Sequence, residues 1–274
     1  MSAKLSPRLK SKKLLRRWQG RKEKLLLSLP ELLDHSSVRG NVEAIHELRV
    51  TIRRLRLYVR LGRPLLSKTA VKGFLRWARG ISKATSGVRD LDVALEWLQG
   101  QEDADEVMEL CQARRAGAWR LARRRLLLPT RGLLKTLVKI KGGGKPHVRL
   151  ARRFAKIESH LAMGVRRAGP LFFKMREDEQ HQFRRLTRWW RYLREVGLPR
   201  RAQKEDALLN ALLQTQEATG NRQNLILAEA ALRRLRRSGV VAELRRKLAA
   251  DQVATSSRIR SSLTRLARLS RARG

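Results

Sequence analysis

The chain contains little of what many folds and many sites depend on. It has one cysteine, Cys111, which excludes an intramolecular disulfide framework, and no Cys or His ligand set surrounds it. Aromatic residues make up 5% of the chain, which disfavours a β-sandwich or barrel. No apolar run approaches the length of a membrane span, and the basic N-terminal region lacks the continuous apolar segment of a secretory signal. We therefore expect a cytoplasmic protein in which Cys111 is buried and unreactive.

Acidic residues are also scarce. The 24 Asp and Glu residues stand against 64 Lys and Arg residues, which leaves a formal net charge of +40. Few folded proteins tolerate that much self-repulsion without an anionic partner. Most of the basic residues are arginine, whose planar guanidinium can hold two phosphate oxygens at once, although a GC-rich genome would also raise the arginine content. The composition predicts a polyanionic partner and favours one that carries phosphate.

Hydrophobic residues make up 42% of the 274 residues, which is enough to bury a sizeable core. They recur at intervals of three and four nearly everywhere, and the alternation typical of strands is absent. The chain is therefore predicted to be all-α. The expected helices cover residues 8–34, 42–62, 68–84, 89–99, 103–127, 148–168, 177–197, 205–218, 222–237, 240–252 and 254–271.

One segment, residues 128–147, interrupts the helical pattern. Pro129 and the run Gly142–Gly144 cannot continue a helix, so the segment divides the chain into an N-terminal half, 1–127, and a C-terminal half, 148–274. We interpret it as a solvated basic linker, and a further phosphate contact is the less favoured alternative. Its lysines are Lys135, Lys139, Lys141 and Lys145.

A line of basic residues runs along the helix predicted for 42–62. Its members are spaced by 3, 4, 3 and 4 residues, which places them on one face of about 80°. They are His46, Arg49, Arg53, Arg56 and Arg60. The adjoining face carries the apolar residues Ile45, Leu48, Ile52, Leu55 and Val59. The line extends for about 21 Å, a shape that suits a linear polyanion better than a single phosphate ester. A solvated basic face, with stems covering the core, is the alternative.

A second, shorter line occurs in the C-terminal half. It repeats the spacing 3, 4 and 3 and consists of His181, Arg184, Arg188 and Arg191. The next position is Glu195, so the line ends there. Two copies of an unusual pattern indicate an internal duplication and a pseudo-twofold arrangement, which could place both lines against one central cavity. Chance repetition in so arginine-rich a chain remains the alternative.

Three segments resemble the signatures of CHAD domains, the conserved histidine α-helical domains. The run His46–Arg56 is similar to the first signature, Val88–Val93 resembles the family's Val-Arg-Asp-x-Asp-Val segment, and His181–Tyr192 is similar to the second signature. The likeness covers about residues 10–270. Trp189 and Trp190 stand where the family usually has a basic and an aliphatic residue, and the segment ending at Asn224 lacks the usual Asp.

The resemblance implies two antiparallel helical bundles, related by a pseudo-twofold axis, around a basic central cavity lined by both lines. It also implies that the chain binds inorganic polyphosphate in this cavity, at polyphosphate granules in some members. Many relatives are fused to a triphosphate tunnel metalloenzyme domain, but the alternating Glu-x-Glu strands of that domain are absent here. We therefore expect binding without catalysis, and no metal or cofactor. The departures at Glu195 and Asn224 put in doubt whether both halves bind equally.

The arginines of both lines are expected to clamp phosphoryl oxygens. His46 and His181 would each donate one N–H when neutral, and a bound polyanion should raise the pKa of each ring. The supporting residues are Arg89, Asp90, Asp92 and Tyr192. Asp90 and Asp92 are expected to orient the arginines or to cap a helix, and a metal site made from them is disfavoured. His35, His147 and His160 are expected to be hydrogen-bonded core residues.

Three other functions stay open. The charge would also suit weak nucleic-acid binding, although the aromatic residues have apolar spacing rather than that of a base-stacking platform. A metal-dependent polyphosphate hydrolase would need paired carboxylates or an activated nucleophile, and neither is visible in the sequence. The third is a helical bundle that coats a granule or a membrane surface.

Overall fold

The computed structural model describes residues 7–38, 40–128, 130–140, 143–235 and 238–271. Helices form nearly all of this part of the chain, and it contains no strand, which confirms the all-α prediction. The elements are α1 (Pro7–Val38), α2 (Val42–Leu61), α3 (Lys68–Ala84), α4 (Ser86–Leu98), α5 (Asp105–Leu126), α6 (Arg131–Val138), α7 (Pro146–Ala168), the 3-10 helix η1 (Gly169–Lys174), α8 (Glu177–Gly197), α9 (Arg200–Glu205), α10 (Ala207–Leu232) and α11 (Gly239–Arg271).

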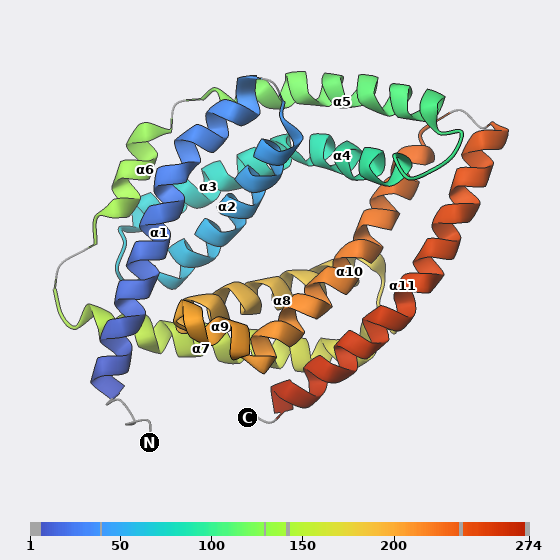
Figure 1. The fold of residues 1–274 in the computed structure, drawn as a ribbon. Coiled ribbons are helices and arrows are strands. Elements are labelled where there is room, and N and C mark those ends of the chain that lie inside the picture. The colour runs from blue at the N-terminus through green and yellow to red at the C-terminus, as the bar shows by residue number, and fades with distance from the viewer. Residues whose placement is uncertain (1–6, 39, 129, 141–142, 236–237, 272–274) are drawn as a thin grey trace.

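Neighbouring helices within each half run antiparallel (Figure 1). Contacts between helices of different halves join the two halves. In the N-terminal half, α1 packs along α2, and α4 runs beside α5 at the top of the view. In the C-terminal half, α7 packs against α8, while α10 and α11 lie side by side. Contacts between halves are extensive, because α1 packs on α7 and α4 packs on α10.

The buried core draws on both halves. The main cluster joins Trp18, Ile52 and Phe74 to Phe183 and Leu193, and all five side chains are almost completely buried. A second cluster, between α4, α5, α10 and α11, includes Leu98, Cys111, Leu225 and Leu248. The prediction that Cys111 is buried is confirmed. Since burying one large apolar side chain is worth about 1.5–3 kcal/mol, these shared clusters hold the halves together.

The linker prediction was wrong for part of its length. Within residues 128–147 the chain forms α6, and its Leu134 and Leu137 are buried in the main core. The fully buried Lys22 of α1 donates from Nζ to the carbonyl oxygen of Leu137 at 2.7 Å. Leucines spaced by three and four residues form a short apolar face, so the segment packs instead of remaining a solvated tether. The lysines Lys135, Lys139 and Lys145 are exposed as expected, whereas Lys141, Pro129 and Gly142 lie outside the described residues.

Two predicted breaks near the C-terminus are absent. Residues 207–232 form the single helix α10 and residues 239–271 the single helix α11, where two helices each were predicted. Gly220 lies inside α10 and is buried; a Cβ there would approach Nη2 of Arg184 to 3.1 Å. A single glycine does not end a helix that is packed along its length. Here it leaves room for an arginine of α8.

Candidate functional site

Helix α2 presents its basic line next to a buried apolar face, as predicted. The helix begins after Asn41, whose side chain accepts from the backbone N–H of Ala44 at 2.9 Å. Ile45, Leu48 and Ile52 are fully buried. The basic residues of the line are only partly exposed, so their aliphatic stems cover the core while their guanidinium groups lie at its edge.

Helix α8 also carries its basic line next to a buried apolar face, although His181 at the start of the line is exposed. It begins at Glu177, where the Glu179 carboxylate accepts from the backbone N–H of Arg176 at 2.9 Å. Phe183 and Leu193 fill the apolar face of the helix. Arg188 is only 7% exposed, which is unusual for an arginine that has no acidic partner.

The two basic lines face one another across the contact between α2 and α8. Arg60 of α2 lies over the Trp189 ring of α8, with 4.6 Å between the guanidinium carbon and the ring centroid. Arg54 lies over Tyr192 at 5.1 Å. Burial is the main cause that lowers the pKa of Arg184 and Arg188, and the charge of Arg53 on the facing helix adds to both shifts. We call this surface between the two helices the arginine cleft.

The arginine cleft holds like charges at an electrostatic cost. Burial, together with the charge of neighbouring Arg53, lowers the pKa of Arg49 and of Arg184 to about 10. Guanidinium groups with such pKa values stay charged at neutral pH, so their mutual repulsion lowers the stability of the folded protein. Several Nε atoms in the cleft are buried and have no hydrogen-bond partner. They belong to Arg53, Arg54, Arg56, Arg184, Arg188 and Arg191.

At one end of the cleft, an arginine of the α2 line already has hydrogen-bond partners within the protein. Arg49 donates from Nη1 to the Ser82 carbonyl oxygen and to Thr85 Oγ1, each at 2.9 Å. Nearby, Arg89 pairs with the exposed Glu96 at 3.6 Å. Arg49 is therefore held by the end of α3 and has fewer free donors than the other arginines of the line.

The prediction for the two aspartates needs correction. Asp92 is buried and accepts a hydrogen bond from Arg115 of α5, an arginine outside both basic lines. Arg115 also donates to the Gly40 carbonyl oxygen at 2.6 Å. Neither aspartate caps a helix, because α4 begins at Ser86. Both lie near Arg49, and burial raises the pKa of each carboxyl even though the neighbouring arginines oppose this shift. The sequence did not indicate Arg115, which is brought to Asp92 only by the packing of α5.

Glu195 closes the other end of the cleft. Its carboxylate pairs with Arg191 at 3.1 Å and with Arg54 at 3.5 Å, and its side chain is 14% exposed. Tyr192 is buried beneath, with Arg191 at 4.6 Å from the ring centroid. The residue that ends the second line in the sequence thus acts as an internal counter-ion. Arg54 was missed, although it is the second of the paired arginines in the first signature.

The two histidines of the lines have lowered pKa values in the free protein. Burial is the main cause that lowers the pKa of His46, and the charges of Arg89 and Arg53 add to it. Burial and Arg184 lower the pKa of His181, although a hydrogen bond with Gln223 opposes the shift. Both rings are therefore neutral at pH 7 without a bound anion. The predicted rise in pKa concerns the bound state and stays a prediction.

The other histidines do not behave as expected. His35 and His160 are exposed and His147 is half-buried, so none of them is a core residue. Trp189 and Trp190 differ from each other: Trp190 is buried in the main core, whereas Trp189 is half-buried and stacks on Arg60. Trp189 therefore adds a cation–π contact where the family usually has a basic residue.

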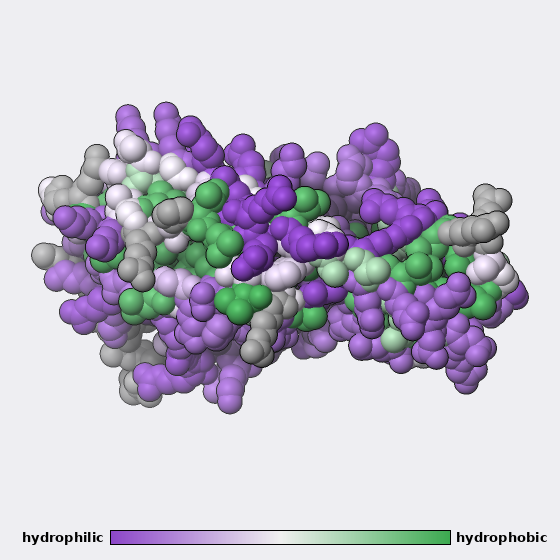
Figure 2. Space-filling model, turned by 90° about the horizontal axis from the view of Figure 1, so that it is seen from above, coloured by the Kyte–Doolittle hydropathy of each residue, from purple (hydrophilic) through white to green (hydrophobic). Residues whose placement is uncertain are grey.

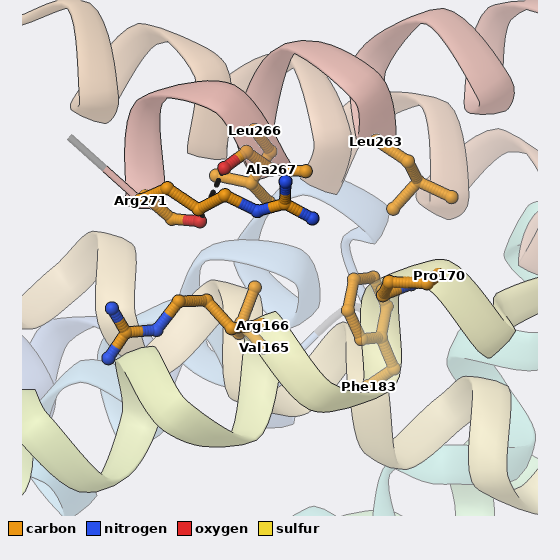
Figure 3. Close-up of a pocket in the computed structure, with 10 residues that line it drawn as sticks. Val165, Arg166, Pro170, Phe183, Leu263, Leu266, Ala267 and Arg271 are labelled. Carbon is orange, nitrogen blue, oxygen red and sulfur yellow. Dashed lines mark hydrogen bonds between the residues drawn. The ribbon is translucent and has the colours of Figure 1, made fainter. Parts of the chain in front are cut away.

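Surface charge by itself does not identify the site. On the face seen from above, hydrophilic side chains are spread over the whole surface, with hydrophobic patches between them (Figure 2). A cavity of about 30 Å³ lies between Phe183, Leu263 and Leu266, with Arg166 and Arg271 at its rim (Figure 3). It has room for about one water molecule and marks a packing gap between α11 and the end of α7.

Within the described ranges, no group of three or more His, Cys, Asp or Glu side chains is arranged to hold a metal ion. Among the same residues, no helix is both long enough and apolar enough to cross a membrane.

The fold and the paired basic lines define an all-helical protein in which a line of arginines from each half faces the other; the predicted central cavity and internal duplication stay predictions. The CHAD domain model matches residues 13–233, which is most of the chain. The chain therefore belongs to the CHAD domain family, and the resemblance seen in its signatures is confirmed.

Two solved structures share this fold. The crystal structure of the CHAD domain from the plant Ricinus communis is 22% identical, with a TM-score of 0.68, over 92% of this chain and 91% of that one. PptA from Streptomyces chartreusis is 16% identical, with a TM-score of 0.61, over 94% of this chain and 98% of that one. A search of curated proteins found no match.

Proposed function

We propose that this protein binds inorganic polyphosphate in the arginine cleft and does not hydrolyse it. The observation that carries the proposal is the set of buried Nε atoms without a hydrogen-bond partner on facing helices. In the described part of the chain, Glu195 is the one carboxylate that forms ion pairs with arginines of the cleft. A polar group that is buried without a partner costs about 1–3 kcal/mol, and more when it is charged. A bound anion would offset the charge and mutual repulsion of these guanidinium groups through their Nη donors.

The shape of the cleft favours a linear ligand over a small one. The α2 line extends for about 21 Å with one cation at nearly every turn, and α8 supplies a second row opposite it. Successive phosphoryl groups of a chain could accept charge-assisted hydrogen bonds from both rows, each worth about 1.5–3 kcal/mol. A single phosphate ester would leave most of these donors unpaired.

Membership of the CHAD family supports the same ligand, because polyphosphate is what the resemblance implies. Association with polyphosphate granules would follow from such binding and forms part of the proposal. We also propose that weak, salt-sensitive binding of nucleic acid is a side effect of the charge.

The test is a titration of the whole protein with long-chain polyphosphate, heparin, DNA and RNA at two salt concentrations. We expect the strongest binding to polyphosphate, and this preference should persist at the higher salt concentration. Equal affinity for all four polyanions would instead show a generic cationic surface. Release of phosphate in the presence of Mg²⁺ or Mn²⁺ would show that the protein hydrolyses polyphosphate, contrary to the proposal.

A matched pair of variants locates the site. Arg53→Gln/Arg188→Gln removes two charges from the cleft, whereas Arg233→Gln/Arg246→Gln removes two exposed charges that already pair with Glu229 and Glu243. We expect the first variant to lose more than about tenfold in polyphosphate affinity. The second should change it by less than about threefold. Equal losses in both variants would place the ligand outside the cleft.

A further inference from the structure

A second basic surface lies where α1 meets the C-terminal end of α8. Two arginines of α1 satisfy carbonyl groups there: Arg17 donates to Val196 at 3.1 Å and to Gly197 at 2.7 Å. Arg21 donates to Glu195 and, at 3.3 Å, to Leu198. The final carbonyl groups of α8 therefore have partners, which explains why these two arginines are needed for the fold.

Other cations beside them have no such role. Two cavities, of about 490 Å³ and about 300 Å³, share Arg21 and Arg200 as lining residues. Lys13 and Arg16 also line the larger cavity, and Lys24 lines the smaller. The side chains of Lys13, Arg16, Lys24 and Arg200 are exposed. No carboxylate in the described part of the chain pairs with any of these four. We call the two cavities together the α1 groove.

Glu195 connects this groove to the arginine cleft. Its carboxylate and Arg54 line the smaller cavity, and both also belong to the end of the cleft. Glu195 is the one carboxylate among the residues that line the groove. It therefore places a negative charge between two rows of cations, at the point where a polyanion leaving the cleft would have to pass.

We propose that the α1 groove is a second phosphate-binding subsite, which holds the part of a polyphosphate chain that extends beyond the cleft. Glu195 separates the two subsites by competing with the ligand for Arg54 and Arg191. This inference rests on the proposed function. It distinguishes ligands by length, because only a chain longer than the cleft reaches the groove.

The first experiment removes the unpaired cations of the groove. The groove variant is Lys13→Gln/Arg16→Gln/Lys24→Gln/Arg200→Gln. The control, Arg120→Gln/Arg124→Gln/Arg245→Gln/Lys247→Gln, removes the same charge from α5 and α11. Titrations use long-chain polyphosphate and tripolyphosphate, which is much shorter than the cleft.

We expect the groove variant to lose at least about tenfold in affinity for the long chain. Its salt dependence should become less steep by up to about 3 in the logarithmic slope, at about 0.7 for each lost phosphate contact. Tripolyphosphate affinity should change by less than about twofold. Equal losses for both ligands, or a loss no larger than in the control, would overturn the subsite. Failure of the unchanged protein to bind any polyphosphate would instead refute the proposed function itself.

The second experiment tests the separating role of Glu195. Glu195→Gln keeps the size of the side chain and removes its charge, so long-chain affinity should increase by about threefold or more in the unchanged background. In the groove variant the same substitution should increase it much less, because the ligand has nowhere to extend. The same increase in both backgrounds would show that Glu195 does not couple the cleft to the groove.

Discussion

The replacement of Arg188 by methionine should make the protein more stable and a weaker binder. Arg188 is only 7% exposed, its Nε has no partner, and Arg53, Arg184 and Arg191 are close enough to lower its pKa. Two like charges about 8 Å apart repel by about 2 kcal/mol at an effective dielectric constant of about 20. Methionine keeps most of the aliphatic stem and removes both the repulsion and the desolvated charge.

After allowance for screening and imperfect packing, we expect the free energy of unfolding to increase by about 1–3 kcal/mol. For a chain of this size that raises Tm by about 2–4 °C for each kcal/mol. The same substitution removes one charge-assisted contact worth about 1.5–3 kcal/mol, so polyphosphate affinity should fall by about tenfold to a hundredfold. Thermal unfolding in phosphate-free buffer and calorimetric titration measure the two effects.

Arg194, on the same helix, is the control. It pairs with Asp206 at 2.7 Å and with Glu158 at 3.3 Å, and it is about as buried as the arginines of the cleft. Arg194→Met should therefore destabilise the fold by about 3 kcal/mol, since it breaks a buried ion pair, and should leave affinity nearly unchanged. If Arg188→Met were as destabilising as Arg194→Met and bound polyphosphate normally, Arg188 would be a structural residue and the reasoning would be wrong.

Three further outcomes are expected. Trp189→Leu removes the ring beneath Arg60 and should lower polyphosphate affinity by about threefold, as measured by titration, without loss of helicity. Leu137→Ala should lower the unfolding free energy in urea by about 2–5 kcal/mol, because the side chain is fully buried; a change below about 0.5 kcal/mol would show that α6 is a tether. Since His46 and His181 have lowered pKa values in the free protein, a bound polyanion that raises them takes up protons. Affinity should therefore increase as pH falls from about 8 to about 6 and level off below the free-state pKa values, and the His46→Gln/His181→Gln variant should lose this dependence.

Periodicity predicted α2 and α8 well because each is amphipathic along its whole length. Residues 177–197 form a helix as expected, and the apolar neighbours of both basic lines are buried. The same method failed at Gly220 and in residues 131–138. Local propensity there favours a break, and tertiary packing outweighs it: Gly220 accommodates Arg184, and Leu137 fills the core.

The sequence by itself determined that this protein is helical, strongly basic, and marked by two arginine lines beside apolar faces, because those properties depend only on composition and on spacing along a helix. The tertiary structure decided which charges have partners. Only the packing of α2 against α8 shows that the lines face one another and that Glu195 pairs with Arg54. Only the packing of α4 against α5 shows that Arg115 rather than a cleft arginine pairs with Asp92. The Arg54–Glu195 and Arg115–Asp92 pairs join different helices, so no local pattern encodes them, whereas Arg191 and Glu195 are four residues apart on α8.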